Sequence, residues 1–180
     1  MRFLDTPIPG VFVIEAEPRA DERGYFARTF CKQEFSDRSL CTEWVQISTS
    51  FNRRRGTLRG MHFQDAPFAE IKLVRCTRGA VYDVALDLRP HSPAYRQWFA
   101  ADLTADNGRM MYIPKGVAHG FQSLADDSEV LYNIGEYYHP EASRGVRWDD
   151  PAFGIVWPVA NPILSPKDQT WPDHGPPRND

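Results

Sequence analysis

Short apolar runs recur at close spacing along this chain, and many of them are rich in β-branched and aromatic residues. Turn residues separate the runs, as at Arg78–Gly79, Arg89–Pro90 and Pro114–Gly116. Such runs bounded by glycine and proline predict strands, and a long series of them favours an antiparallel sandwich or barrel. The strands expected are 11–14, 25–30, 44–50, 57–64, 72–76, 81–88, 97–103, 110–113, 119–124 and 129–134.

Helical periodicity is scarce in this sequence. Lys32–Leu40 reads as a helix, and a second, weaker helical signal lies near Ser165–Thr170. There is no internal repeat and no linker rich in Gly or Ser, so the chain is expected to form one domain over residues 1–180. The proline-rich end, about 172–180, is expected to be a disordered tail.

The run Thr57–Gln64 carries two residues whose relative orientation matters. Side chains alternate across a strand, so His62 and Arg59 should point to opposite faces. A bulge at Gly60 would change this, because an extra residue resets the alternation. Both arrangements remain open from the sequence.

Composition and charge narrow the possible partners. The net charge of −3 and the pI of about 6.0 give no support for a nucleic-acid or anionic-membrane partner. No apolar stretch is long enough to cross a bilayer, and the first residues lack the apolar region of a signal peptide. The three cysteines form no CxxC motif, which fits free thiols in a reducing cytosol. A cytoplasmic location is therefore expected.

Two of the five histidines, His62 and His119, lie in strand-like segments. A lone histidine there is as readily a satisfied core residue as a functional one. Lys72 opens the next run after His62, and a base and a cation on neighbouring strands can remove a proton beside a carbonyl and stabilise the enolate. The metal-ligand spacings HxH, HxxH and HExxH are missing, which disfavours a metal site, and so are GxSxG and GxGxxG.

The segment Leu58–Gln64 reads LRGMHFQ and resembles the LRGxHxQ signature of dTDP-4-dehydrorhamnose 3,5-epimerases and their relatives. The resemblance covers most of the chain, from Asp21–Gly24 to about Asp168. So many motifs in the same order are highly specific for the family. The further matching segments are 72–75, 78–84, 87–89, 92–93, 113–116, 118–121, 131–132, 137–138 and 148–154.

The resemblance implies an all-β fold, a cupin-type jelly-roll barrel with a few short helices. It also implies a homodimer that exchanges strands, here Val11–Ile14 and Tyr25–Phe30. The implied substrate is a 4-keto-6-deoxyhexose linked to dTDP or another nucleoside diphosphate, and neither a metal nor another cofactor is implied.

The site residues of the family carry over by position. His62 matches the catalytic base, Asp168 the acid that orients it, and Tyr132 the general acid on the opposite face. Lys72 matches the residue beside the C4 carbonyl oxygen. The remaining matches are substrate contacts at Arg59, His119, Lys167 and Gln46, and nucleotide contacts at Arg23, Phe26, Arg28 and Tyr138. Among these, Tyr138 would stack on the base, and Arg23 would come from the partner subunit.

Arg28 and Ser143 stand where many family members have glutamate, and Ser48 or Thr49 stands where asparagine is usual. These departures leave open which nucleotide carries the sugar and whether C3, C5 or both are inverted. Two alternatives to an epimerase are a non-catalytic jelly-roll that binds a sugar nucleotide and a metal-dependent cupin enzyme. Loss of proton exchange or the presence of a stoichiometric metal would distinguish them.

Overall fold

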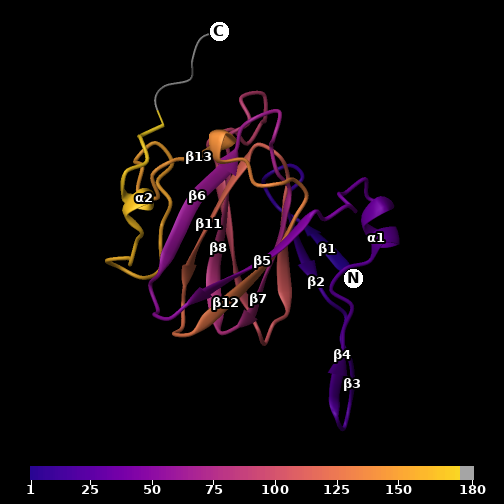
Figure 1. Ribbon diagram of the computed structural model, residues 1–180. Helices are drawn as coiled ribbons and strands as arrows, with labels where there is room; N and C mark the ends of the chain where they lie inside the picture. Colours follow the sequence, from indigo (N-terminus) through magenta and orange to yellow (C-terminus); the bar gives the residue numbers. More distant parts are fainter. Residues whose placement is uncertain (175–180) are drawn as a thin grey trace.

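The computed structural model describes residues 1–174, so most of the predicted tail lies outside the described residues. Two antiparallel sheets face each other (Figure 1). The six-stranded sheet has the order β1 (Arg2–Asp5), β2 (Phe12–Glu15), β10 (Arg109–Ile113), β7 (Lys72–Arg78), β12 (Ser128–Ile134) and β5 (Gln46–Asn52). The five-stranded sheet has the order β13 (Ser143–Gly145), β6 (Leu58–Gln64), β11 (Val117–Ser123), β8 (Ala80–Asp87) and β9 (Trp98–Thr104).

Strands far apart in the sequence are neighbours in both sheets, as with β2 beside β10 and β6 beside β11. This arrangement is the jelly-roll barrel predicted from the sequence. The helical elements are short: α1 (Lys32–Ser36), the 3-10 turn η1 (Pro140–Ala142) and α2 (Pro166–Gln169). Among the described residues, no helix has the length and apolar character needed to cross a membrane.

Buried side chains form three apolar clusters, one between the sheets and one on the outer face of each. Alternation along a strand explains this: Val74 of β7 faces the barrel interior, whereas Leu73 packs on the outer side with Phe35. Likewise Ala85 of β8 faces inward and Leu86 outward. Because many strands are covered on both faces, their sequences read as nearly continuous apolar runs.

Two elements differ from the prediction. The helix expected over Lys32–Leu40 ends at Ser36, and Ser39 has a left-handed backbone with φ +57°, which a helix cannot contain. Of the strand expected over 25–30, only the part in β4 (Gly24–Phe26) forms, and it pairs with β3 (Arg19–Asp21) as a two-stranded arm. The arm projects away from the barrel (Figure 1).

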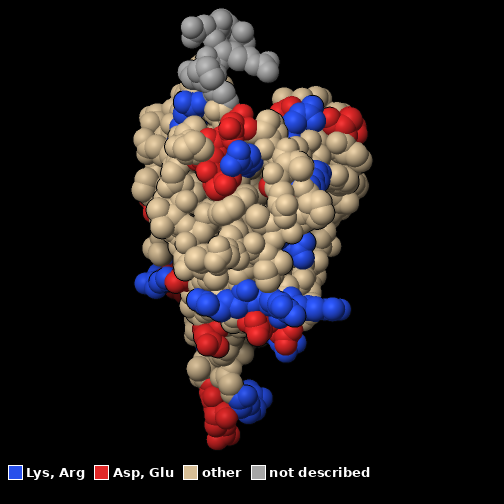
Figure 2. Space-filling model, turned by 90° about the vertical axis from the view of Figure 1, so that its left-hand side faces the viewer, with Lys and Arg blue, Asp and Glu red and all other residues tan. Residues whose placement is uncertain are grey.

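The strand predicted at Val11–Ile14 corresponds to β2, which pairs with β1 and β10 of its own chain. Within one chain it is thus an internal strand of the sheet, and its exchange with a second copy stays a prediction. The β3–β4 arm is the segment that stands free of the barrel in both views (Figures 1 and 2).

The segment after Trp171 docks on the barrel as far as it is described. The backbone N–H of His174 donates to Asp150 Oδ2 at 2.6 Å, and His174 Nε2 lies 3.0 Å from the Tyr95 hydroxyl. Asp173 forms an ion pair with Arg147 at 3.0 Å. Residues 172–174 were expected to be disordered, but these contacts hold them against the surface.

Candidate active site

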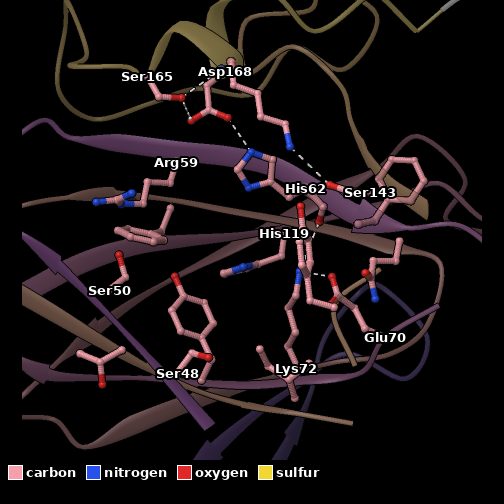
Figure 3. A pocket seen from close by; sticks show the side chains of 18 residues that line it. Ser48, Ser50, Arg59, His62, Glu70, Lys72, His119, Ser143, Ser165 and Asp168 are labelled. Carbon is pink, nitrogen blue, oxygen red and sulfur yellow. Dashed lines mark hydrogen bonds and ion pairs between the residues drawn. The ribbon is translucent and has the colours of Figure 1, made fainter. Parts of the chain in front are cut away.

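A pocket of about 450 Å³ opens between the two sheets. The six-stranded sheet contributes Ser48, Lys72 and Tyr132, and the five-stranded sheet contributes Arg59, His62 and His119. The segment around α2 closes one side with Asp168 and Lys167. Figure 3 shows Arg59, His62, Lys72 and His119 pointing toward a common space.

A bulge in β6 places Arg59 and His62 on the same side. His62 pairs with His119 and Arg59 pairs with Phe121, so three residue steps on β6 oppose two on β11. Gly60 has φ +138°, and a Cβ there would lie 2.5 Å from the Cα of Gly120, so only glycine permits this approach. The bulge settles the orientation that the sequence left open.

His62 and Asp168 form a hydrogen-bonded pair at the pocket wall (Figure 3). His62 Nε2 lies 2.5 Å from Asp168 Oδ1, and the Ser165 hydroxyl donates to Asp168 Oδ2 at 2.9 Å. Ser165 is also the N-cap of α2, because its Oγ accepts the Asp168 backbone N–H at 3.1 Å. Burial alone would raise the pKa of Asp168, but the bonds from His62 and Ser165 outweigh it and leave this pKa below its ordinary value.

Trp171 supports this pair from behind. Its indole lies against Gly145, where an added Cβ would overlap the ring, and Gly145 is the cross-strand neighbour of His62. The ring centroids of His62 and Trp171 are 6.2 Å apart in an edge arrangement. The indole N–H lies beside Asp168 and helps to lower its pKa, although it lacks the geometry of a regular hydrogen bond. The missing side chain at Gly145 thus makes room for the indole.

A second histidine–aspartate pair lies deeper in the barrel. His119 Nε2 is 2.7 Å from Asp83 Oδ1, and both side chains are almost fully buried. The Tyr132 ring packs edge-on to His119 with centroids 5.9 Å apart. Burial, and next the negative charge of Asp83, raises the pKa of the Tyr132 phenol. The phenol therefore stays protonated throughout the physiological pH range.

Lys72 is held by a carboxylate inside the pocket (Figure 3). Its Nζ lies 2.7 Å from Glu70 Oε1 and 3.5 Å from the backbone carbonyl oxygen of His62, and both charged side chains are nearly buried. On the far side, Arg59 Nε donates to Asn52 Oδ1 at 2.8 Å. The pocket therefore presents cations at separate points around a central space.

The pocket brings together eight of the residues expected from the sequence: His62, Tyr132, Asp168, Lys72, Arg59, His119, Lys167 and Tyr138. Gln46 lies outside the lining, and its Oε1 instead accepts the backbone N–H of Tyr138 at 3.0 Å. Arg23 and Phe26 lie on the β3–β4 arm and are largely exposed to solvent. Arg28 forms an ion pair with Glu34 at 3.7 Å, and both residues line a different pocket.

Three residues of the site carry signals that the sequence reading did not use. Asp83 is a carboxylate within a buried apolar strand, Glu70 is an acid two residues before Lys72, and Trp171 follows closely after Asp168. A charged residue in an apolar strand needs a partner, so Asp83 could have been matched with a histidine. Among residues 1–174, no cluster of three or more His, Cys, Asp or Glu side chains has the arrangement of a metal site.

Comparison with known proteins gives one consistent result. Residues 5–174 match the family model of dTDP-4-dehydrorhamnose 3,5-epimerase. The chain is 45% identical over 174 residues to the dTDP-4-dehydrorhamnose 3,5-epimerase of Methanothermobacter thermautotrophicus, covering 94% of this chain and 92% of that one. It is 38% identical to the dTDP-4-dehydrorhamnose 3-epimerase of Streptomyces niveus, covering 94% of this chain and 82% of that one.

A solved structure of the same type superposes closely. The crystal structure of dTDP-4-dehydrorhamnose 3,5-epimerase from Bacillus anthracis, with TDP and PPi bound, has a TM-score of 0.93 and 38% sequence identity. The match covers 96% of this chain and 99% of that one. Identity at this level over nearly the whole length of both chains extends the likeness from the fold to the family.

Proposed function

The chain belongs to the dTDP-4-dehydrorhamnose 3,5-epimerase family, and we propose that it inverts C3, C5 or both in a nucleotide-linked 4-keto-6-deoxyhexose. It is thus an isomerase that acts on a carbohydrate. The observation that carries the proposal is the His62–Asp168 pair, which shares one pocket with Tyr132 and Lys72. Each of these groups has a defined task in moving a proton beside a ketone.

His62 is the proposed base. Hydrogens on C3 and C5 are acidic because the neighbouring C4 is a ketone. With Nε2–H donating to Asp168, the lone pair is on Nδ1, and that ring nitrogen faces the pocket in Figure 3. When Nδ1 takes the proton, the carboxylate of Asp168 stabilises the imidazolium that forms.

Lys72 is the proposed electrostatic stabiliser. Loss of a C3 or C5 proton leaves an enolate with its charge on the C4 oxygen, and a nearby ammonium lowers the barrier to reach it. The ion pair with Glu70 fixes the position of the ammonium but also offsets part of its charge. Lys72 is therefore proposed to stabilise the C4 oxygen by donating a hydrogen bond from a fixed position as well as by its positive charge.

Tyr132 is the proposed proton donor for the opposite face. Inversion requires that the carbon be reprotonated from the side away from His62. The pKa of the Tyr132 phenol is raised by burial and by Asp83, so the proton is available at neutral pH. Because the Tyr132 phenol keeps its proton until the enolate forms beside it, the proton can then be transferred to the enolate carbon.

The nucleotide end is proposed at Tyr138, Lys167 and Ser143. Tyr138 lines the pocket with an exposed ring that can stack on a base, and Lys167 Nζ lies 3.5 Å from Ser143 Oγ. The Bacillus anthracis relative carries TDP, which supports a thymidine nucleotide as the first candidate. Ser143 in place of the usual glutamate leaves room for another nucleotide.

The arm is proposed to complete the site of a second copy. An isolated two-stranded ribbon is only marginally stable in water. In the β3–β4 arm, the side chain of Arg23 is 85% exposed and Phe26 is 74% exposed. A partner subunit would cover these residues and receive Arg23 and Phe26 near its nucleotide. Arg28 is expected at the base of the arm, where it forms an ion pair with Glu34.

We infer that the protein is a homodimer and that it is located in the cytoplasm. Cys31, Cys41 and Cys76 are free thiols, which fits a reducing compartment.

Proton NMR of the protein in deuterated water with dTDP-4-keto-6-deoxyglucose tests the proposal. Deuterium at both C3 and C5 is expected for double epimerisation, and deuterium at one carbon for single epimerisation. His62→Ala should slow exchange by roughly 10²- to 10⁴-fold, the usual contribution of a general base. The same experiment is repeated with the sugar carried on CDP. Unchanged exchange in His62→Ala, or no exchange in the wild type with either substrate, would contradict the proposal.

A further inference from the structure

We propose that Gln46 and Gln64 together form a clamp that holds the Tyr137–His139 backbone so that the Tyr138 ring is preorganised to stack on the nucleotide base. This inference rests on the proposed function and adds two positioning residues to it. Gln46 was expected as a substrate contact and Gln64 lines the pocket, and the role inferred here is their hold on this backbone. The pair is called the glutamine clamp below.

The clamp engages three successive backbone groups. Gln64 Nε2 donates to the Tyr137 carbonyl at 3.0 Å, Gln46 Oε1 accepts the Tyr138 N–H at 3.0 Å, and Gln64 Oε1 accepts the His139 N–H at 2.7 Å. A loop backbone is ordinarily satisfied by water or by its own turn. Here two side chains from outside the loop bind it at consecutive positions.

The clamp residues flank the two ends of this loop. Gln46 of β5 pairs with Ile134, the last residue of β12, and Gln64 of β6 pairs with Ser143, the first residue of β13. The connection from β12 to β13 therefore leaves one sheet beside Gln46 and enters the other beside Gln64. The clamp fixes the loop where it crosses the mouth of the pocket.

Gln64 lines the pocket, but both of its amide N–H groups are used inside the protein. Gln64 is only 3% exposed, and the second N–H of its amide donates to the Phe68 carbonyl at 3.0 Å. Both amide donors and the oxygen are thus bonded inside the protein, as a buried amide requires. The Phe68 ring also stacks on His139 with centroids 3.7 Å apart, so the two loops are tied together.

The held loop presents an exposed ring. Tyr138 is 58% exposed although its backbone is bonded on both sides. An exposed aromatic on a fixed backbone is a binding platform, because little conformational freedom is lost when a base stacks on it. Without the clamp the ring would sample many positions, and binding would have to order it.

The expected consequence is a loss of nucleotide affinity with the chemistry intact. In Gln64→Leu, KM for the nucleotide sugar should rise roughly 5-fold or more, up to the roughly 150-fold that loss of a whole base–aromatic stack would cost. Because His62, Lys72 and Tyr132 are untouched, kcat should change by about 3-fold or less, as expected when uniform binding is removed. Gln46→Leu should show the same pattern with a smaller rise.

Gln122 offers a matched control. It is fully buried, and its amide binds both backbone groups of Val159 at 2.8 and 2.9 Å, away from the pocket lining. Gln122→Leu removes a similar loop tether and should lower stability without raising KM. If Gln122→Leu raised KM as much as Gln64→Leu, general loosening and not the clamp would be the cause.

The deciding experiment measures KM, kcat and the dissociation constant of dTDP for Gln64→Leu, Tyr138→Ala and the double variant. If the clamp acts through Tyr138, adding Gln64→Leu to Tyr138→Ala should weaken dTDP binding no further. Additive losses, or an unchanged KM in Gln64→Leu, would overturn the inference. If Gln64→Leu does not fold, Gln46→Leu in the same cycle decides. A wild-type protein without exchange activity would instead overturn the proposed function.

Discussion

Two histidine–aspartate pairs lie next to each other in the barrel, and they differ in what can reach them. The side chain of His62 is 38% exposed to the pocket, whereas that of His119 is 5% exposed. The two histidines are cross-strand neighbours, yet Asp168 comes from the surface helix α2 and Asp83 from the buried strand β8. The same two residue types therefore serve different ends.

The difference shows that access decides which pair can exchange protons. A ring that opens on the pocket can take a proton from a substrate, and Asp168 on the short helix α2 is held in place by Ser165. His119 also lines the pocket, but its ring is almost closed off, and Asp83 beside it raises the pKa of Tyr132 after burial does. In the proposed reaction, the His62–Asp168 pair takes the proton and the His119–Asp83 pair supports the proton donor Tyr132.

The largest expected effect is a difference in kcat between substitutions of the two aspartates, Asp168 and Asp83. Asp168→Asn should lower kcat by roughly 10²-fold or more, because a neutral amide cannot stabilise the imidazolium. Asp83→Asn should lower kcat by about 10-fold or less, because Asp83 does not contact the base. Deuterium incorporation rates at C3 and C5 measure both, and equal losses would contradict the division of roles.

A smaller effect is expected from disturbing the support of His62. Gly145→Ala should push the Trp171 indole away from Gly145 and lower kcat roughly 10-fold, since small misplacements of a base are costly. In a Trp171→Ala background the added methyl has room. The double variant should then be no slower than Trp171→Ala alone, and a further loss would show that the methyl acts elsewhere.

Asp83→Asn should affect stability and the alkaline limb of the pH profile. Disrupting this buried pair should lower the free energy of unfolding by about 1–3 kcal/mol in urea titrations. Removing the negative charge should also shift the pKa of Tyr132 downward, toward but still above its ordinary value, since burial remains. An alkaline limb that stays in place would show that Tyr132 does not report the charge of Asp83.

The smallest effect concerns the docked end of the chain. Burial, and next the charge of Arg96, lowers the pKa of His174, so the folded protein binds this proton more weakly than the unfolded chain. Stability should therefore decrease as the pH falls below about 6.5, the ordinary histidine value. Because His174 is partly exposed, a decrease in Tm of only about 2 °C is expected.

His174→Gln should remove this decrease in stability near pH 6.5. It should leave a second decrease, at lower pH, that is due to Asp168. The pKa of Asp168 is lowered, so its contribution is present above its unfolded value near 4 and is lost only as the pH falls further. Thermal unfolding of both proteins from pH 7.5 to 3 measures the two windows. A decrease near pH 6.5 that persists in His174→Gln would assign it to another group.

Local pattern and motif spacing were sufficient for several conclusions. The short apolar runs predicted most strands of both sheets, and the LRGxHxQ signature predicted the family, which the comparisons confirm. Both depend on residues close together in the chain, where steric rules and spacing apply directly. The strands β1 and β13, of four and three residues, were too short to carry such a signal, and β13 forms by pairing with the distant β6.

The sequence by itself determined the fold class, the family and the identity of eight residues that line the pocket. The tertiary structure alone decided their geometry: the β6 bulge that turns Arg59 and His62 to one side, the choice between two histidine–aspartate pairs, and the engagement of Gln46 by Tyr138. The physical reason is that orientation, burial and hydrogen bonding arise between strands. A residue's partner across the barrel fixes its accessibility and pKa, and no local pattern encodes that partner.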